Sequence, residues 1–244
     1  MRVASTWDDL IAATRAREGD VVVVDPCTAG VRNIGDRLLD LSDACVSAPG
    51  ISVVGYVSVT AAAIHAVHRL VRCFDAEIVV RGVDDGVDAL AATLHRSLAA
   101  ASAEPLLASA RWFAPVPSDI ARALALLFRR PDKVRSVDDL ASAASTTRRT
   151  LDRWLARAGL APARTLLGCA RVSAAFHLMT RGKVRAANAA ALLGYPSARA
   201  LARELHRLTG WAPSGIPNHV TQAAFVEAIR PRLYRNARAD SGSY

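Results

Sequence analysis

The segment from Ser136 to Gly159 reads SVDDLASAASTTRRTLDRWLARAG. We expect a short helix, a tight turn and a second helix that Thr147 caps at its N-terminus. The small side chain of Ala141 would let the two helix axes approach at a steep angle. The second helix should place Leu151, Trp154 and Leu155 inward and Arg148, Arg149, Asp152, Arg153 and Arg157 outward. Such a helix suits the major groove of DNA, because guanidinium groups match the acceptors of guanine.

The same pattern recurs about fifty residues later. Gly194 and Tyr195 form a turn after a short alanine-rich helix, and Ser197 then caps a second helix. The inward face should carry Ala189, Ala190 and Leu193 in the first of these helices and Leu201 and Leu205 in the second, with Arg199, Arg203 and Arg207 outward. Both copies end in Gly-x-Ala-Pro, which stops a helix. A repeat is stronger evidence than either copy alone.

The second half of the chain contains helical patterns and no strand pattern. We expect helices over about 118–130, 137–144, 148–158, 163–181, 186–193, 198–209 and 219–229, with Ser118 as a good N-cap and a disordered tail at the end. The first half is different: apolar runs at Val21–Val24, Ile51–Val59 and Ile78–Val80 alternate with helical patterns, which predicts a small α/β domain with a buried parallel sheet. Its helices should be amphipathic, with apolar faces at 5–17 (Trp7, Leu10, Ile11, Thr14), at Ile34, Leu38, Leu41 and Cys45, at Ile64, Val67, Val71 and Phe74, and at Val87, Leu90, Leu94 and Leu98.

Charge divides the chain in the same place. Residues 1–113 carry ten arginines and fourteen acidic residues, a net charge of −4, whereas residues 114–244 carry twenty-one basic and eight acidic residues, a net charge of +13. A strongly basic half is suited to binding a polyanion. Charge alone does not distinguish DNA from RNA or an acidic membrane. The expected domains are therefore 1–113, an Ala-Pro-Val-Pro linker at 114–117, 118–217, and a C-terminal helix and tail at 218–244.

Residues 118–217 resemble the DNA-binding domain of the AraC/XylS family of transcription regulators. The matching residues are Leu140, Ala141, Thr147, Leu151, Arg153, Arg171, Val172, Ala175, Ala190, Gly194, Tyr195, Ser197, Leu201, Arg203, Leu205, Gly210 and Pro213. Some of these positions keep the apolar character but not the family's favoured residue: Leu155, Leu201 and Leu205 stand where aromatic residues are favoured, and Ala189 stands where a β-branched residue is usual. Ala212 replaces the usual Ser or Thr. The resemblance implies two helix-turn-helix units joined by a long helix, and two recognition helices in successive major grooves. It implies double-stranded DNA and RNA polymerase as partners, and no cofactor.

The resemblance also assigns positions to the DNA interface. These are Thr147, Arg148, Arg149, Asp152, Arg153, Ser197, Ala198, Arg199, Arg203 and Arg207. Base-facing positions would be Arg149, Asp152 and Arg153 in the first helix and Ala198, Arg199 and Arg203 in the second. Each arginine could instead contact phosphate or only solvent. Asp152 is more suited to an ion pair with Arg148 or Arg149 than to reading cytosine.

The first half loosely resembles the later part of a receiver domain. Asp25, Ser58 or Thr60, and Arg81 each follow a predicted strand, in the order of a phosphoacceptor, a hydroxyl and a basic residue. The chain has no first strand with an acidic pair upstream, and an arginine stands where that family has lysine. We expect a degenerate module for homodimerisation or partner contact; a phosphorylated switch and a small-ligand sensor are alternatives. A sensor or interaction protein whose activity lies in this half is the alternative to a DNA-binding regulator.

An enzyme is not expected. His65, His68, Cys73, Asp84 and Asp85 could be imagined as a metal or nucleophile site, but exposed histidines and a helix-starting turn explain them more simply. The four cysteines have no Cys-x-x-Cys spacing and are expected to be reduced and buried, with no metal bound. No signal peptide or membrane-length apolar run is visible, so we expect a cytoplasmic protein.

Overall fold

A computed structural model of the chain describes residues 2–27, 33–48, 51–101, 103, 106–107, 116–216 and 220–235. The chain divides into two compact units, Met1–Ala101 and Ser102–Tyr244. This division falls before the predicted linker, of which the structure describes only Val116 and Pro117. The expected C-terminal tail lies almost wholly outside the described residues.

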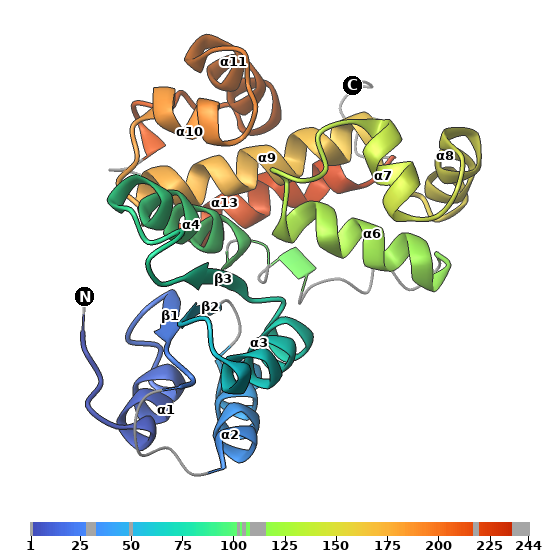
Figure 1. Cartoon of the computed structure of the whole chain (residues 1–244). Coiled ribbons are helices and arrows are strands. Elements are labelled where there is room, and N and C mark those ends of the chain that lie inside the picture. The colour runs from blue at the N-terminus through green and yellow to red at the C-terminus, as the bar shows by residue number, and fades with distance from the viewer. Residues whose placement is uncertain are drawn as a thin grey trace, which may run out of the picture. The chain divides into compact units, whose positions relative to one another are not determined.

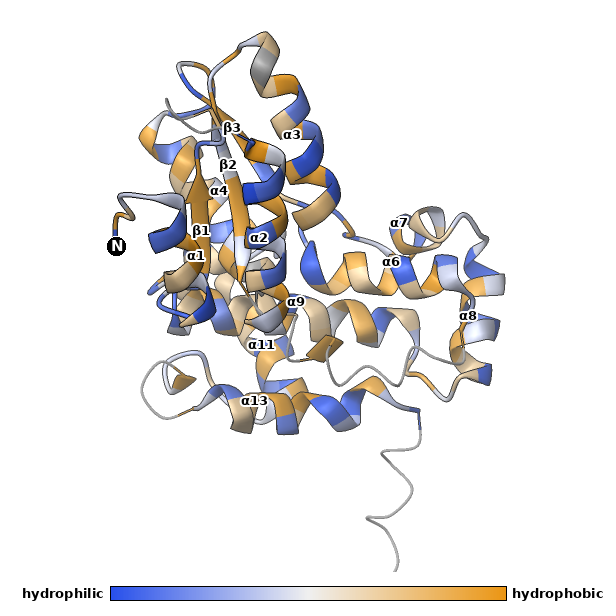
Figure 2. Cartoon of the chain, turned by 90° about the horizontal axis from the view of Figure 1, so that it is seen from below, coloured by the Kyte–Doolittle hydropathy of each residue, from blue (hydrophilic) through white to orange (hydrophobic). Residues whose placement is uncertain are grey.

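The first unit contains the predicted parallel sheet. Its strands are β1 (Val21–Val24), β2 (Ser52–Val57) and β3 (Glu77–Val80), in the order β1-β2-β3. Val24 pairs with Gly55, and Val57 pairs with Val80, so that the carboxyl ends of the strands share one edge. Figure 2 shows β1 and β2 mostly in the apolar colour, as expected for strands that helices cover.

Helices cover both faces of this sheet (Figure 1). One face carries α4 (Val87–Ala101), and the other carries α1 (Trp7–Arg15), α2 (Ile34–Ser47) and α3 (Ala61–Phe74). The core between them includes Val22, Val24, Leu38, Leu41, Val53 and Leu70. The α/β architecture predicted for this region is confirmed.

The buried face of α3 differs from the predicted one. Ile64 is 69% exposed and Val71 is 46% exposed, whereas Ala63, Ala66 and Leu70 are buried. The reason is a close approach to the sheet: a Cβ on Gly55 of β2 would lie only 2.7 Å from the side chain of Leu70. Gly55 leaves room for Leu70, and Ala63 and Ala66 are buried on the same side of α3, whereas Ile64 and Val71 lie on the exposed side. Phe74 packs against the core, as predicted. On α4, the predicted inward residue Val87 is also exposed, because it is the first residue of the helix.

The described part of the second unit contains only helices and one isolated bridge. The helices are α6 (Ser118–Arg129), α7 (Val137–Ala143), α8 (Arg148–Arg157), α9 (Ala163–Thr180), α10 (Ala186–Leu192), α11 (Ala198–Thr209), α13 (Gln222–Ile229) and the 3-10 helix η2 (Arg230–Leu233). These bounds confirm the predicted helices to within a few residues. Ser118 is not the N-cap of α6, because Pro117 occupies that position and Ser118 already lies in the helix.

The long helix α9 is the centre of the second unit. It contacts α6, α7, α8, α10 and α11, and Figure 1 shows α7–α8 toward one of its ends and α10–α11 toward the other. Phe176 of α9 stacks on Phe225 of α13, with ring centroids 4.1 Å apart. At the C-terminal end, Ala161 N donates to Leu233 O at 2.9 Å and Arg235 N donates to Gly159 O at 2.9 Å. Through its contacts with all four helices, α9 supports both the α7–α8 pair and the α10–α11 pair.

Candidate nucleic-acid interface

The two helix pairs, α7–α8 and α10–α11, repeat one hydrogen-bonded turn. In the first pair, Thr146 N donates to Ala141 O at 3.0 Å, and in the second, Tyr195 N donates to Ala190 O at 2.9 Å. Both turns need a left-handed residue, which is Ser145 (φ +48°) in the first and Gly194 (φ +72°) in the second. The hydrogen-bonded residues of the two turns lie 49 positions apart, whereas the N-caps of α8 and α11, Thr147 and Ser197, lie 50 positions apart. The second turn is therefore one residue longer than the first.

Polar N-caps fix where α8 and α11, the outer helices of the two pairs, begin. The Thr147 hydroxyl accepts a hydrogen bond from Thr150 N, and the Ser197 hydroxyl accepts one from Ala200 N, each at 3.2 Å. These caps satisfy backbone donors of the first turn, which a helix cannot satisfy by itself. At the other end, α11 stops at Gly210 with φ +81°. Both predicted caps and this predicted stop are confirmed.

A capping box starts α7. Asp139 N donates to the Ser136 hydroxyl at 3.0 Å, and the Asp139 carboxylate accepts from the backbone of Arg135 and Ser136, each at 2.9 Å. These hydrogen bonds, that from Arg135 first, hold the pKa of Asp139 below its ordinary value. The first helix pair therefore begins at a well-defined residue.

The residues predicted to contact DNA lie on the outer faces of α8 and α11. Leu151, Leu155, Leu201 and Leu205 are buried beneath them, as predicted. The exposed members of the predicted set are Thr147, Arg148, Arg149, Asp152, Arg153, Ser197, Arg199, Arg203 and Arg207, and Ala198 is half-buried. Both helices therefore present arginines outward over a leucine face.

Two details of α8 differ from expectation. Trp154 is only half-buried, and the Arg157 guanidinium lies 5.4 Å from its ring centroid, which leaves this ring at the surface under a cation. Asp152 makes no salt bridge with any of the described residues, so the ion pair expected with Arg148 or Arg149 is wrong. The Asp152 carboxylate consequently remains on the outer face among arginines.

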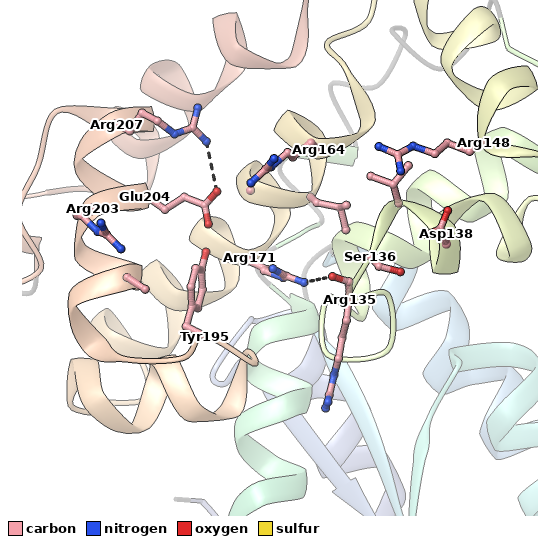
Figure 3. A pocket seen from close by; sticks show the side chains of 14 residues that line it. Arg135, Ser136, Asp138, Arg148, Arg164, Arg171, Tyr195, Arg203, Glu204 and Arg207 are labelled. Atoms are coloured by element: carbon pink, nitrogen blue, oxygen red, sulfur yellow. Dashed lines mark hydrogen bonds and ion pairs between the residues drawn. The ribbon is translucent and has the colours of Figure 1, made fainter.

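A groove of about 650 Å³ lies between the two helix pairs, with α9 as its floor. Six arginines line it within the described part of the chain: Arg135, Arg148, Arg164, Arg171, Arg203 and Arg207. Asp138 and Glu204 are its two acidic residues. Figure 3 shows Arg164 and Arg171 on α9, with Arg148 to one side and Arg203, Glu204 and Arg207 to the other. The groove thus brings predicted residues of both outer helices, Arg148, Arg203 and Arg207, to one surface with a net charge of +4.

Contacts inside the groove tie the two helix pairs to α9. Arg171 donates to the backbone carbonyl of Arg135, and its guanidinium carbon lies 5.8 Å from the ring centroid of Tyr195. The Tyr195 hydroxyl faces the carboxylate of Glu204 (Figure 3), and burial together with this charge raises the pKa of Tyr195 well above its ordinary value. Arg171 therefore links α9 to the segment just before α7 and to the turn between α10 and α11.

The DNA interface predicted from the sequence did not include the groove residues on α9. Arg164, Gly168 and Arg171 are spaced four and three residues apart, which places them on one face of a helix. That spacing was visible in the sequence. The contribution of Glu204 was less accessible, because its place in the groove depends on how α11 packs on α9.

A second cluster lies at the carboxyl edge of the sheet in the first unit. Arg81 pairs with Asp25 at 3.2 Å, and its guanidinium lies 5.0 Å from the ring centroid of Tyr56. Tyr56 donates to Asp85 at 2.8 Å. Two of the three predicted edge residues therefore meet, whereas the Thr60 hydroxyl is used to cap α3, where it accepts from Ala63 N.

The residues considered for catalysis or metal binding are dispersed. The described residues contain no group of three or more His, Cys, Asp or Glu side chains that could hold a metal ion. His65 and His68 are exposed, as predicted. Cys169 is buried and burial raises its pKa to about 12, but Cys27 and Cys73 are exposed, so the prediction of buried cysteines is wrong for these two. Cys73 lies on the outer face of α3, and Cys27 lies in the loop after β1.

Within the described residues, no helix is both long and apolar enough to cross a membrane. Comparison with known protein families, curated proteins and solved structures gave no match to this chain.

Proposed function

We propose that this chain is a sequence-specific, DNA-binding transcription regulator. The pairs α7–α8 and α10–α11 act as helix-turn-helix units, and α8 and α11 are recognition helices that enter successive major grooves. The observation that carries the proposal is the repeated, capped turn that presents an arginine-rich helix twice on one supporting helix. The resemblance to the AraC/XylS family supports the same reading and adds RNA polymerase as a partner.

The dimensions agree with this proposal. The supporting helix α9 has 18 residues, so it is about 27 Å long at 1.5 Å per residue. With the turns at its ends, this approaches the roughly 34 Å between successive major grooves on one face of a duplex. The net charge of +13 over residues 114–244 supplies the attraction to phosphates that DNA binding requires.

For the first unit we propose a receiver-like module that serves homodimerisation or contact with a partner. The parallel order β1-β2-β3 and the meeting of Asp25 with Arg81 at the carboxyl edge support this reading. Because the described residues contain no group of three acidic side chains that could hold the metal needed for phosphorylation, we assign no phosphorylated switch to this edge.

The proposal is tested by selecting binding sites for the full chain from a pool of random duplex DNA. We expect a site with two conserved segments about one helical turn apart. Affinity should fall steeply with salt, by about 0.9 log units per log unit of salt for each neutralised phosphate. A folded chain that enriches no duplex sequence, or whose weak binding ignores salt, would contradict the proposal.

A further inference from the structure

The groove between the two helix pairs has a defined position relative to a duplex, provided that the proposed function holds. Two major grooves on one face of DNA are separated by a minor groove, which the two sugar-phosphate backbones border. If the recognition helices occupy those two major grooves, the protein surface between them faces the minor groove and its two sugar-phosphate backbones. The lining of the groove can therefore be compared with the chemistry of phosphodiesters.

The cations of the groove are available to a ligand. Arg148, Arg164 and Arg203 are exposed, and none of them forms a salt bridge with the described residues. They come from α8, α9 and α11, so the charge is spread across the groove from one helix pair to the other (Figure 3). Arginine suits such a surface, because its planar donors form charge-assisted hydrogen bonds with phosphate oxygens.

Glu204 is the one acidic residue on the α11 side of this described groove. It pairs with Arg207 at 3.3 Å, and it lies so close to α9 that a Cβ on Gly168 would be 2.6 Å from its carboxylate. Its negative charge opposes that of an incoming phosphate. If the groove binds phosphate, loss of the Arg164 charge should therefore weaken DNA binding, and loss of the Glu204 charge should strengthen it.

We infer that this groove binds the phosphodiester backbone of the DNA segment between the two major-groove sites. Arg164 is a direct phosphate contact from the supporting helix, Arg148 adds its charge from α8, and Glu204 limits the attraction. The backbone contact is independent of base sequence and fixes the position of both recognition helices on the duplex.

The first test measures full-chain binding to a selected site and to unrelated duplexes over a range of salt. Arg164→Gln should weaken all sequences by a similar factor, on the order of tenfold for one charge-assisted hydrogen bond, and flatten the salt slope by about 0.9. Glu204→Gln should strengthen binding to all sequences. The matched control is Arg122→Gln, which removes the same charge from an exposed position on α6 outside the groove and should leave the salt slope unchanged.

The second test removes the phosphate charge instead. Neutral methylphosphonates are placed between the two conserved segments of the selected site. Wild-type binding should weaken, and Arg164→Gln should no longer respond to the substitution, because the two changes remove one contact. If wild type ignores these methylphosphonates, or if both proteins respond equally, the groove does not bind this backbone although the proposed function stands. If wild type binds no duplex, the proposed function and this inference both fail.

Discussion

Arg153 and Arg203 occupy equivalent places on the two outer helices, two residues after the buried Leu151 and Leu201. From these exposed positions a guanidinium can reach a guanine edge with two hydrogen bonds, which is worth about 1–3 kcal/mol of discrimination. Arg153→Ala or Arg203→Ala should therefore weaken the selected site by that amount and relax preference at one or two base pairs. A base-substitution binding series would measure this, and the positions affected by the two variants should lie about one helical turn apart.

Arg207 is expected to behave differently from Arg153 and Arg203. It lies further along α11 and lines the groove, where Glu204 holds it. Arg207→Ala should weaken all sequences similarly and flatten the salt slope by about one unit. If Arg153→Ala and Arg203→Ala behave in this way too, both residues contact phosphate and their assignment as readers of bases is wrong.

The two turns differ in how well their residues suit the left-handed backbone conformation that each requires. Ser145 adopts a left-handed conformation that costs a side-chain-bearing residue about 1–2 kcal/mol, whereas Gly194 adopts it without that cost. Ser145→Gly should raise the free energy of unfolding by roughly 0.5–1 kcal/mol, since glycine's unfolded-state entropy offsets part of the gain. Gly194→Ala should lower it by about 1 kcal/mol.

Chemical denaturation would check both values. Steric clash does not complicate the Gly194 variant, because the nearest atom to an added Cβ is Arg135 Nε at 3.9 Å. A small stabilisation by Ser145→Gly together with a small destabilisation by Gly194→Ala would support one turn geometry shared by the two helix pairs. Destabilisation by Ser145→Gly would show that the first turn differs from the second.

Sequence periodicity predicted the elements better than their contacts. Helix bounds and caps at Thr147 and Ser197 are local properties, since the hydroxyl and the amide it accepts from lie three residues apart. The buried face of α3 was mispredicted because it depends on Gly55, in a strand that hydropathy alone cannot position against the helix. The groove was missed for the same reason: its lining comes from three parts of the chain that only tertiary packing brings together.

Charge separates the two halves of the chain, and we assign DNA binding to the basic one. The Asp25–Arg81 pair in the other half is half-buried on the Asp25 side. Small phosphodonors should leave Asp25 unmodified, because the described residues contain no group of three acidic side chains that could hold a metal ion beside it. Asp25→Asn should change neither DNA affinity nor oligomeric state. Acid-labile phosphate in stoichiometric amounts, absent from the Asn variant, would instead restore a phosphorylated switch.

We propose that α8 and α11 enter successive major grooves on one face of a duplex. Methylation protection at guanine N7 tests it most directly, because this atom lies in the major groove. With the full chain bound to its selected site, we expect two clusters of protected guanines, about 10–10.5 base pairs apart between centres. Protection of a single cluster, or strong binding that leaves every guanine N7 reactive, would contradict the claim.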